Sequence, residues 1–546
     1  MKADITRTTF HPDKHYSRVI AQQGRVQIDA DWNEQVSISN EYLRRLAMDL
    51  IGPCGGPQAD LGFAITPIDV GGGPSATDFA IGPGVYYVDG IRCELRAQWL
   101  DATPVKDGKN QIAVTTLMLD GIAFDKDQYL TVVDPDNNKS AQARIVSVDY
   151  AKRILTLTDI AAFGAAKPAK LRLRRLTRWQ LQPQLAAPAL ATGRYHVYLD
   201  VWERLVTCIE DDSIREVALE GPDTGARGQI VWQVRTLPAG EADECLLPGA
   251  LGSMLQPDNR GLLRARARPE HSDTDPCIIA PDASYRGPEN QLYRVEIHTG
   301  NLGGPAGAKP SFKWSRDNGS VTFPIARGGG SNVLILESLG RDDRLGLNEG
   351  DWVEVVDDAY VLQGRSTPLL QVHAIDRGRM AVTLSGTPAG DVGKDPALHP
   401  LLRRWDHKAG DPDEGGLDLG PDNAALIPAK MDDDAWIDLE DGVQVQFVAG
   451  PDAVYRSGDY WLIPARVATG DVEWPNARVP DEQGALHDQG VALPPLGIAH
   501  SYAPLAVIEV AGDGVDVAYD CRLQFAALTA PRLRGTARKK AEAGNA

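Results

Sequence analysis

Residues 311–326 read SFKWSRDNGSVTFPIA, and this stretch is the strongest single indicator of the fold. Aromatic residues alternate with polar ones before Asn318-Gly319, and apolar residues alternate with polar ones after it. Asn-Gly accepts the positive φ angles of a type I′ turn. The stretch therefore predicts a β-hairpin with one face toward a core and the other toward water.

The same period of two extends outward along the chain. Residues 293–298 and 230–235 also alternate, and residues 78–90 read as strand, turn, strand, turn. The 54 Gly and 37 Pro residues suit many turns and short strands. We predict a mainly β fold of several antiparallel sheets or small barrels, with one N-terminal α-helix.

A segment of the sequence occurs twice. Residues 129–134 (YLTVVD) resemble residues 352–357 (WVEVVD), and the matches continue at equal offsets to an arginine-rich strand followed by Trp179 or Trp405. This predicts two copies of one β-module, each a short barrel or meander. A duplicated module favours a scaffold over an enzyme.

These patterns divide the chain into seven regions. They are an arm and amphipathic helix (1–57), a small β-region (58–110), the first module copy (111–180), a central β-domain (181–330), the second copy (331–406), an acidic loop with a C-terminal β-domain (407–530) and a basic tail (531–546).

The helix is predicted over residues 31–51, after an extended arm. Asp31 is a suitable N-cap, Glu34 completes a capping box, and Gly52-Pro53 ends the helix. Its apolar stripe has two interpretations. It covers an edge of the protein's own sheet, or it docks the protein onto a partner.

Charge and hydropathy limit the partners. The formal charge of -19 argues against a nucleic-acid or anionic-membrane binder, and no apolar run is long enough to span a membrane. No secretory signal follows Met1, so we expect synthesis in the cytoplasm, and release by another route, such as cell lysis or carriage on a particle, stays open. The basic tail is expected to be disordered.

The six cysteines lack the spacing of a zinc site. We expect mostly reduced, buried thiols. The pair that we would test for a disulfide is Cys245 and Cys277.

Motifs for catalysis are missing from the sequence. It has no nucleophile elbow, zinc-protease motif, P-loop or dinucleotide fingerprint. We therefore predict no enzyme and no cofactor, although glycoside hydrolysis leaves no fixed sequence mark. Polar residues Arg294, Glu296, His298, Lys313 and Asp317 are expected on the exposed face around the hairpin, where charged pairs are ordinary. The alternative is general acid–base catalysis by a carboxylate near the histidine.

Two acidic segments resemble cation sites. Asp134, Asp136 and Asn138 mimic the start of a calcium loop but lack its glycine and final Glu, so a polar turn is expected. Clustered carboxylates in the acidic loop are candidate ligands for Ca²⁺: Asp411, Asp413, Glu414 and Asp418. The alternative is a solvated acidic loop.

Several motifs resemble a known family. Residues 10–34 (FHPDKHYSRV through QIDADWNE), 199–204 (LDVWER), 293–298 (YRVEIH), 312–319 (FKWSRDNG) and 458–466 (GDYWLIPAR) are similar to an uncharacterised bacterial family. Its members are often encoded beside the sheath, baseplate and tail genes of phage-tail-like contractile injection systems. Residues 82–90 also look like a short β-motif of tail and baseplate proteins.

The resemblance implies a structural or accessory component of such a particle: a baseplate-, fibre- or cap-associated subunit that acts by assembly. Its partners would be other subunits, including copies of itself, with no direct membrane insertion. The expected docking residues lie on the arm and the helix: Phe10, His15, Tyr16, Trp32, Val36 and Leu43. The alternative is a glycan-binding or glycan-cleaving β-protein that acts on a target cell envelope.

Overall fold

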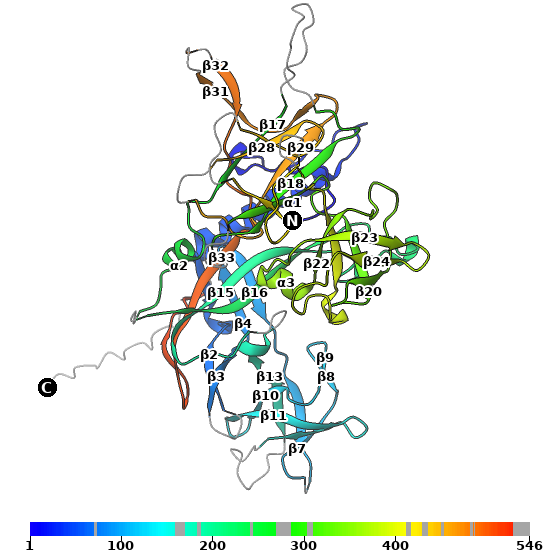
Figure 1. Cartoon of the computed structure of the whole chain (residues 1–546). Coiled ribbons are helices and arrows are strands. Elements are labelled where there is room, and N and C mark those ends of the chain that lie inside the picture. Colours follow the sequence, from blue (N-terminus) through cyan, green and yellow to red (C-terminus); the bar gives the residue numbers. More distant parts are fainter. Residues whose placement is uncertain are drawn as a thin grey trace, which may run out of the picture.

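The computed structural model is mainly β, as predicted (Figure 1). It describes residues 1–69, 74–106, 108–158, 170–182, 187–240, 244–268, 285–302, 309–410, 416–428, 435–448, 453–480, 484 and 486–527. The helices are α1 (Asp29–Ile51), α2 (Pro248–Leu255) and α3 (Asp358–Gln363), with short 3-10 turns at Pro12–Lys14, Gln58–Asp60, Trp179–Leu181, Asp212–Ile214, Val217–Leu219 and Pro396–Leu398. No helix in these ranges is long and apolar enough to cross a membrane.

A central sheet joins the two halves of the sequence. Its order is β16-β15-β33-β34, with β15 (Gly193–Val206), β16 (Arg227–Pro238), β33 (His500–Ala511) and β34 (Gly514–Asp520). β15 pairs antiparallel with both β16 and β33 along most of its length. Because its two faces are covered, seven consecutive residues of β15 are buried.

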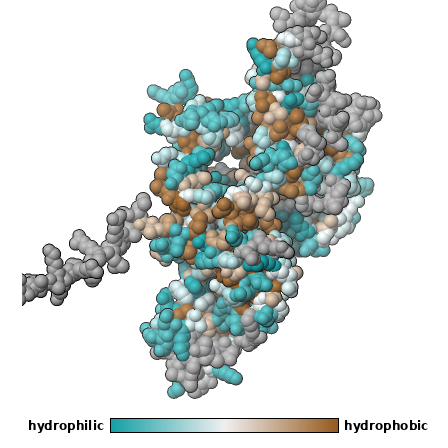
Figure 2. All heavy atoms as spheres, turned by 90° about the vertical axis from the view of Figure 1, so that its left-hand side faces the viewer, coloured by the Kyte–Doolittle hydropathy of each residue, from teal (hydrophilic) through white to brown (hydrophobic). Residues whose placement is uncertain are grey.

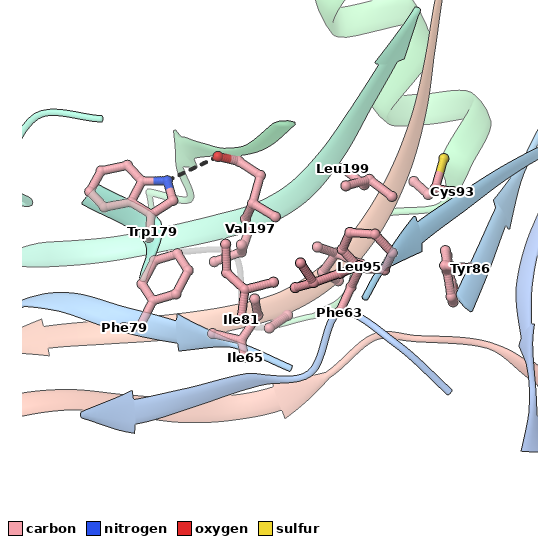
Figure 3. Close-up of a cluster of buried hydrophobic side chains, with 14 of the residues drawn as sticks. Phe63, Ile65, Phe79, Ile81, Tyr86, Cys93, Leu95, Trp179, Val197 and Leu199 are labelled. Atoms are coloured by element: carbon pink, nitrogen blue, oxygen red, sulfur yellow. Dashed lines mark hydrogen bonds between the residues drawn. The ribbon is translucent and has the colours of Figure 1, made fainter. Parts of the chain in front are cut away.

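Two small sheets pack against the central sheet. One has the order β35-β1-β4-β5, with β1 (Cys54–Pro57), β4 (Gly84–Val88), β5 (Ile91–Leu95) and β35 (Gln524–Phe525); the other has β14-β3-β2, with β2 (Ile65–Asp69), β3 (Pro74–Ile81) and β14 (Thr177–Arg178). Their shared core is shown in Figure 3. There Trp179 stacks on Phe79 at 5.3 Å and donates its Nε1–H to the Val234 carbonyl at 3.0 Å.

The repeated segments form two closed six-stranded barrels. Barrel 1 has the order β10-β11-β12-β7-β6-β13, with β6 (Leu100–Pro104), β7 (Gln111–Val114), β10 (Tyr129–Asp134), β11 (Lys139–Asp149), β12 (Ile154–Leu157) and β13 (Leu171–Arg175). A two-stranded ribbon, β8 (Met118–Leu119) and β9 (Ile122–Ala123), is inserted in it.

Barrel 2 has the order β22-β23-β24-β21-β20-β25, which is the same topology. Its strands are β20 (Thr322–Arg327), β21 (Val333–Leu336), β22 (Trp352–Val356), β23 (Leu370–Asp376), β24 (Ala381–Leu384) and β25 (Leu401–Trp405). Each barrel has its own apolar core. The first two strands of each barrel lie before residues 129 and 352, where the similarity in sequence begins.

A further two-sheet unit lies at the top of Figure 1. Its five-stranded sheet has the order β26-β19-β18-β29-β30, with β18 (Gln291–Thr299), β19 (Ser311–Ser315), β26 (Ala425–Leu426), β29 (Tyr460–Arg466) and β30 (Asp471–Val472). Its three-stranded sheet has β17-β28-β27, with β17 (Leu262–Ala267), β27 (Ile437–Asp438) and β28 (Val443–Val448), and a ribbon follows as β31 (Asn476–Pro480) and β32 (Leu486–Gly490).

The predicted hairpin over residues 311–326 is wrong, although its turn is present. Asn318 and Gly319 have φ angles of 54° and 66°, as the turn requires. β19, however, pairs with β18 and β26, whereas β20 pairs with β21 and β25. The chain therefore passes from the five-stranded sheet into barrel 2 at this turn, and each strand pairs with strands of its own module.

The expectation of reduced thiols is wrong for Cys245 and Cys521, and the disulfide is not the candidate pair Cys245–Cys277. Cys245 forms a disulfide with Cys521, 276 residues away in sequence, which ties the segment before α2 to the end of β34. Cys277 lies outside the described residues. Cys54 and Cys93 are buried free thiols, and Cys208 is a half-buried free thiol. For these three residues the prediction of reduced cysteines is confirmed.

Candidate functional site

The polar face of β18 and β19 is buried, which corrects the expectation of an exposed face. Arg294, Glu296, His298 and Lys313 are all at most 3% exposed. The outer face of barrel 2 and the first residues of the chain cover them, so the alternation in sequence reflects an interface between modules. Burial of both faces is why eight consecutive residues of β18 are buried.

Charged groups in this interface satisfy one another. The Nζ atom of Lys313 lies 2.6 Å from Oε2 of Glu354 on β22 and 3.6 Å from Oε1 of Glu296. Glu296 also accepts a hydrogen bond from Nε of Arg294 at 2.6 Å, and its Oε1 lies 3.0 Å from Nζ of Lys2. Buried ions are tolerated when they are paired in this way.

The pairing controls protonation. Burial alone would raise the pKa of Glu296, but the charges of Lys2, Arg294 and Lys313 outweigh it and hold that pKa well below its usual range. Burial would likewise raise the pKa of Glu354, and Lys313 lowers it. Both carboxylates are therefore ionised acceptors, whereas a general acid needs a raised pKa.

Two buried histidines adjoin this network. Burial lowers the pKa of His298, and its Nε2 lies 4.0 Å from Oδ2 of Asp422 while its Nδ1 has no hydrogen-bond partner within the described part of the chain. Burial also lowers the pKa of His407 to about 4. Its ring stacks on Trp352 at 5.6 Å. Both rings are neutral at physiological pH.

A cavity of about 480 Å³ lies beside the buried network, where the modules meet. Its wall includes Arg44 of α1, Trp202 of β15, His298 of β18, Asp358 of α3 and Arg403 of β25. The wall carries charges of both signs, and several are already paired, such as Arg204 with Asp358 at 2.8 Å. The space suits a small polar molecule held by hydrogen bonds.

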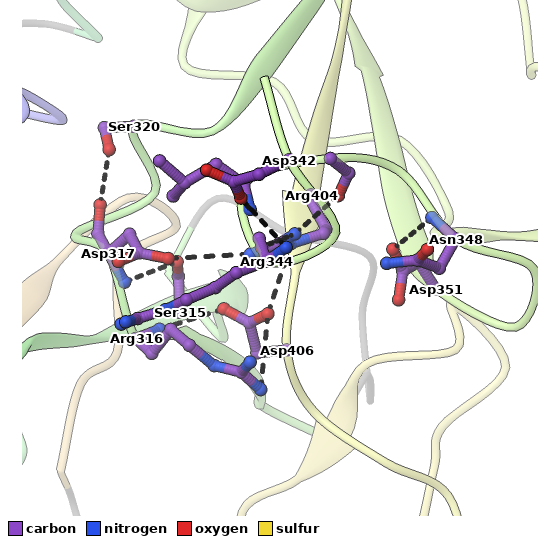
Figure 4. A network of polar contacts seen from close by, with 12 residues as sticks. Ser315, Arg316, Asp317, Ser320, Asp342, Arg344, Asn348, Asp351, Arg404 and Asp406 are labelled. Atoms are coloured by element: carbon purple, nitrogen blue, oxygen red, sulfur yellow. Dashed lines mark hydrogen bonds and ion pairs between the residues drawn. The ribbon is translucent and has the colours of Figure 1, made fainter. Parts of the chain in front are cut away.

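Asp317 belongs to a second, separate network (Figure 4). Arg404 lies 3.3 Å from Asp406 and 3.5 Å from Asp317, and Arg316 pairs with Glu440 at 2.7 Å. Burial and the neighbouring Asp406 raise the pKa of Asp317 to about 6. Burial raises the pKa of Glu440 to about 7 despite Arg316. The five residues predicted to share one face are thus divided between two networks.

A second cavity, of about 650 Å³, lies beside Asp317. Residues of the N-terminal arm form one wall, among them Asp4 and Arg7, and Arg341 and Arg344 of barrel 2 form another. The sequence did not indicate this cavity, because its walls come from segments more than 300 residues apart.

The arm at residues 1–9 is anchored on its own chain. Asn318 Nδ2 donates to the carbonyls of Met1 and Ala3 at 3.1 and 2.8 Å, and Arg7 pairs with Glu473 at 2.6 Å. The capping box is wrong: α1 begins at Asp29, its N-cap Ile28 makes no side-chain cap bond, and Glu34 accepts from Thr9 Oγ1 at 2.5 Å. The acidic side chains at the start of α1 hold the arm instead of capping the helix.

The predicted docking residues are mostly exposed. Trp32 is 74% exposed, Leu43 60% and Val36 45%, and Leu46 and Leu50 are exposed beside them. On the arm, His15 and Tyr16 are exposed and Phe10 is half-buried. At 3.6 residues per turn, the five apolar helix residues fall within roughly 80° of arc, so they form one stripe. We call it the α1 stripe.

The opposite side of α1 faces the protein. Ala30 and Ile38 are its buried residues, and Arg44 pairs with Glu203 of β15 at 2.9 Å. An ordinary surface helix turns its apolar stripe toward the core. In α1 the apolar stripe faces solvent instead, and in this sense the helix is reversed. The interpretation that the stripe covers an edge of the protein's own sheet is therefore wrong.

Figure 2 shows one face of the molecule, with hydrophobic side chains gathered across its middle.

The candidate cation ligands are placed only in part. Asp411, Asp413 and Glu414 lie outside the described residues, and Asp418 is exposed. The described ranges contain no group of three metal-ligating side chains. In the other acidic segment, Asp134 Oδ1 accepts from the backbone N–H groups of Asp136 and Asn137 at 3.0 and 3.2 Å, which confirms the polar turn.

Together, the barrels, sheets and buried ion networks define a multi-module β protein. The chain belongs to DUF6519, a family of unknown function, which matches residues 1–110, 186–256 and 258–543. No curated protein and no solved structure matches the chain.

Proposed function

We propose that this protein is a structural or accessory subunit of a phage-tail-like contractile injection particle, incorporated through the α1 stripe. The observation that carries the proposal is the reversed helix. Trp32, Val36, Leu43, Leu46 and Leu50 leave a contiguous apolar stripe in water although the helix is packed on its other side. Such stripes are characteristic of protein–protein contacts, in which aromatic residues supply much of the binding energy.

The motifs of residues 10–34 support the choice of partner, because they include the start of this helix and resemble proteins encoded with such particles. The rigid attachment of the β-modules supports an assembly role. Buried ion pairs join the five-stranded sheet to barrel 2, as a platform subunit needs. Placement as a baseplate-, fibre- or cap-associated subunit follows the same resemblance.

The buried network bears on the glycan-directed alternative, for which Glu296 and Asp317 are the candidate carboxylates. Glu296 lines the cavity where the modules meet, but Lys2, Arg294 and Lys313 engage its carboxylate and hold its pKa low, so it does not suit the role of a general acid.

The experiment uses the intact particle from the native host. Full-length variants Trp32→Glu and Leu43→Glu would be expressed in place of the native chain, and copies per particle would be measured by quantitative mass spectrometry. The control is Val217→Glu, because Val217 is 85% exposed on a different segment. We expect at least a tenfold loss of copies for both helix variants, an unchanged melting temperature, and normal incorporation of the control. Normal incorporation of W32E and L43E, or absence of the native chain from the particle, would refute the proposal.

A further inference from the structure

Barrel 1 lies largely outside the family match. The gap at residues 111–185 contains five of its six strands, whereas barrel 2 lies within a matched segment. Barrel 1 is therefore an additional copy of a module that DUF6519 already contains. The two copies can be compared residue by residue, because their strands pair in the same register.

The register identifies equivalent positions on the outer faces. In barrel 2, Arg403 pairs with Glu354 on one side and with Thr322 on the other. In barrel 1, Arg174 pairs with Thr131 on β10, and Trp99 lies opposite it, one residue before Leu100, which pairs with Leu173.

The arginine at the next position has one role in both copies. Arg175 donates to the carbonyls of Leu119, Ile122 and Ala123, and Arg404 donates to those of Arg344 and Gly346. Each therefore binds carbonyls of its own barrel. This shared contact supports the residue-by-residue equivalence.

In barrel 2 the outer face is a docking surface. Glu354 forms the buried ion pair with Lys313 of β19, and Arg403 donates to the carbonyl of Gly319. Arg403, Glu354 and Thr322 all line the cavity where the modules meet. In barrel 2, the outer face of the module therefore binds the five-stranded sheet.

In barrel 1 the equivalent face is partly exposed, because Trp99 and Arg172 are exposed while Thr131 and Arg174 are half-buried. Trp99 is 37% exposed, and Arg172 and Arg174 lie over its ring at 5.2 and 4.6 Å. Arg172 is 3.7 Å from Asp101, but no described carboxylate is within ion-pair distance of Arg174. Barrel 1 contacts the rest of the chain elsewhere, through Gln142 of β11, whose Oε1 accepts from Asp69 N at 2.9 Å.

The substitutions between copies change the charge of the face. Thr131 stands where barrel 2 has Glu354, and Arg172 stands where it has Leu401. Residues 99–178 contain thirteen Lys and Arg against nine Asp, within a chain of charge -19. The face thus retains the docking arginine, loses the carboxylate beside it, and gains an aromatic ring and the Arg172–Asp101 pair.

We propose that the outer face of barrel 1, formed by Trp99, Thr131, Arg172 and Arg174, is a docking surface for an acidic polypeptide segment of a partner protein. The partner supplies the carboxylate that Arg174 lacks, and the Trp99 ring holds both guanidinium groups in place through cation–π contacts. This surface is separate from the α1 stripe and does not depend on it. Figure 1 places barrel 1 at the lower end of the molecule.

The test measures binding of fluorescein-labelled poly-L-glutamate to the full-length protein by anisotropy at low salt. The variants are R172E/R174E, Trp99→Ala and Arg174→Gln. The matched control is K126E/K152E, which makes the same charge change at exposed positions of the same barrel. We expect at least a tenfold rise in Kd for R172E/R174E, a smaller rise for the single variants, and a change below twofold for the control.

Three results would overturn the proposal. They are no binding by the native protein, an equal loss in the control, and tighter binding of single-stranded DNA of equal charge through the same arginines, which would assign the face to nucleic acid. Melting temperatures verify folding. If R172E/R174E does not fold, R174Q decides the outcome, with at least a threefold rise in Kd expected.

Discussion

The Nζ atom of Lys313 on β19 lies 2.6 Å from Oε2 of Glu354 on β22, and this buried ion pair joins the five-stranded sheet to barrel 2. Trp405 Nε1 donates to the same Oε2 at 3.0 Å, and the Lys313 ammonium lies over the Trp405 ring at 4.4 Å. The pair thus combines charge, hydrogen bond and ring contact across an interface. Its removal is the most direct test of how the modules are held.

We predict that Lys313→Met destabilises the fold by about 3–5 kcal/mol, because it leaves Glu354 buried without its counter-ion. The measurement is the midpoint of urea denaturation. Replacing both members, as in K313M/E354L, should recover most of the loss. The control is Arg341→Met, since Arg341 pairs with Asp342 at the surface and should cause little change. Equal effects of K313M and R341M would contradict the buried-pair account.

Glu440 should make stability depend on pH. Burial raises its pKa from the usual 4.5 to about 7, so the folded state binds a proton that the unfolded state has released. The contribution is complete below about pH 4.5, and stability falls as pH rises from there through 7. The native protein should therefore lose up to about 3 kcal/mol over this range relative to Glu440→Gln.

The measurement is the urea midpoint of both proteins at pH 5 and pH 8. The difference between them isolates Glu440 from other titrating groups. Parallel pH profiles for the native protein and E440Q would show that Glu440 has no raised pKa in the fold.

The disulfide gives a third prediction. Non-reducing peptide mapping should recover Cys245 linked to Cys521, and Cys245→Ser should cost about 2–4 kcal/mol because the bond constrains a long loop of the unfolded chain. Cys208→Ser is the control, since that thiol is free. A peptide joining Cys245 to Cys277 would contradict the structure.

Asn318 should anchor the N-terminal arm. Asn318→Gly keeps a residue type that tolerates φ of 54° but removes the bonds to the Met1 and Ala3 carbonyls. We expect faster hydrogen exchange at residues 2–9, while β18 and β19 stay protected. The matched control is Asn110→Gly, at φ 54° in the turn before β7. Deleting residues 1–30 is a poor test of docking, because the deletion also removes Lys2 from the buried network around Glu296.

Period-two alternation identified strands correctly at residues 78–88, 293–298 and 311–315. It could not identify their partners. An Asn-Gly turn constrains the backbone of two residues, whereas strand pairing depends on which strands lie alongside. β19 and β20 therefore pair in different sheets and do not form the predicted hairpin. The prediction that the polar face of β18 is exposed was wrong for the same reason. Arg294 and Glu296 look like surface residues in sequence, and only the docking of barrel 2 makes them core.

By itself, the sequence determined the mainly β class, the single long helix near the N-terminus and the repeated module, because these depend on local periodicity and on similarity between segments. Only the tertiary structure decided the direction of the α1 stripe, the burial of Lys313 and Glu354, and the pairing of Cys245 with Cys521. These are contacts between residues far apart in the chain. Their energies depend on which surfaces meet, and no local pattern carries that information.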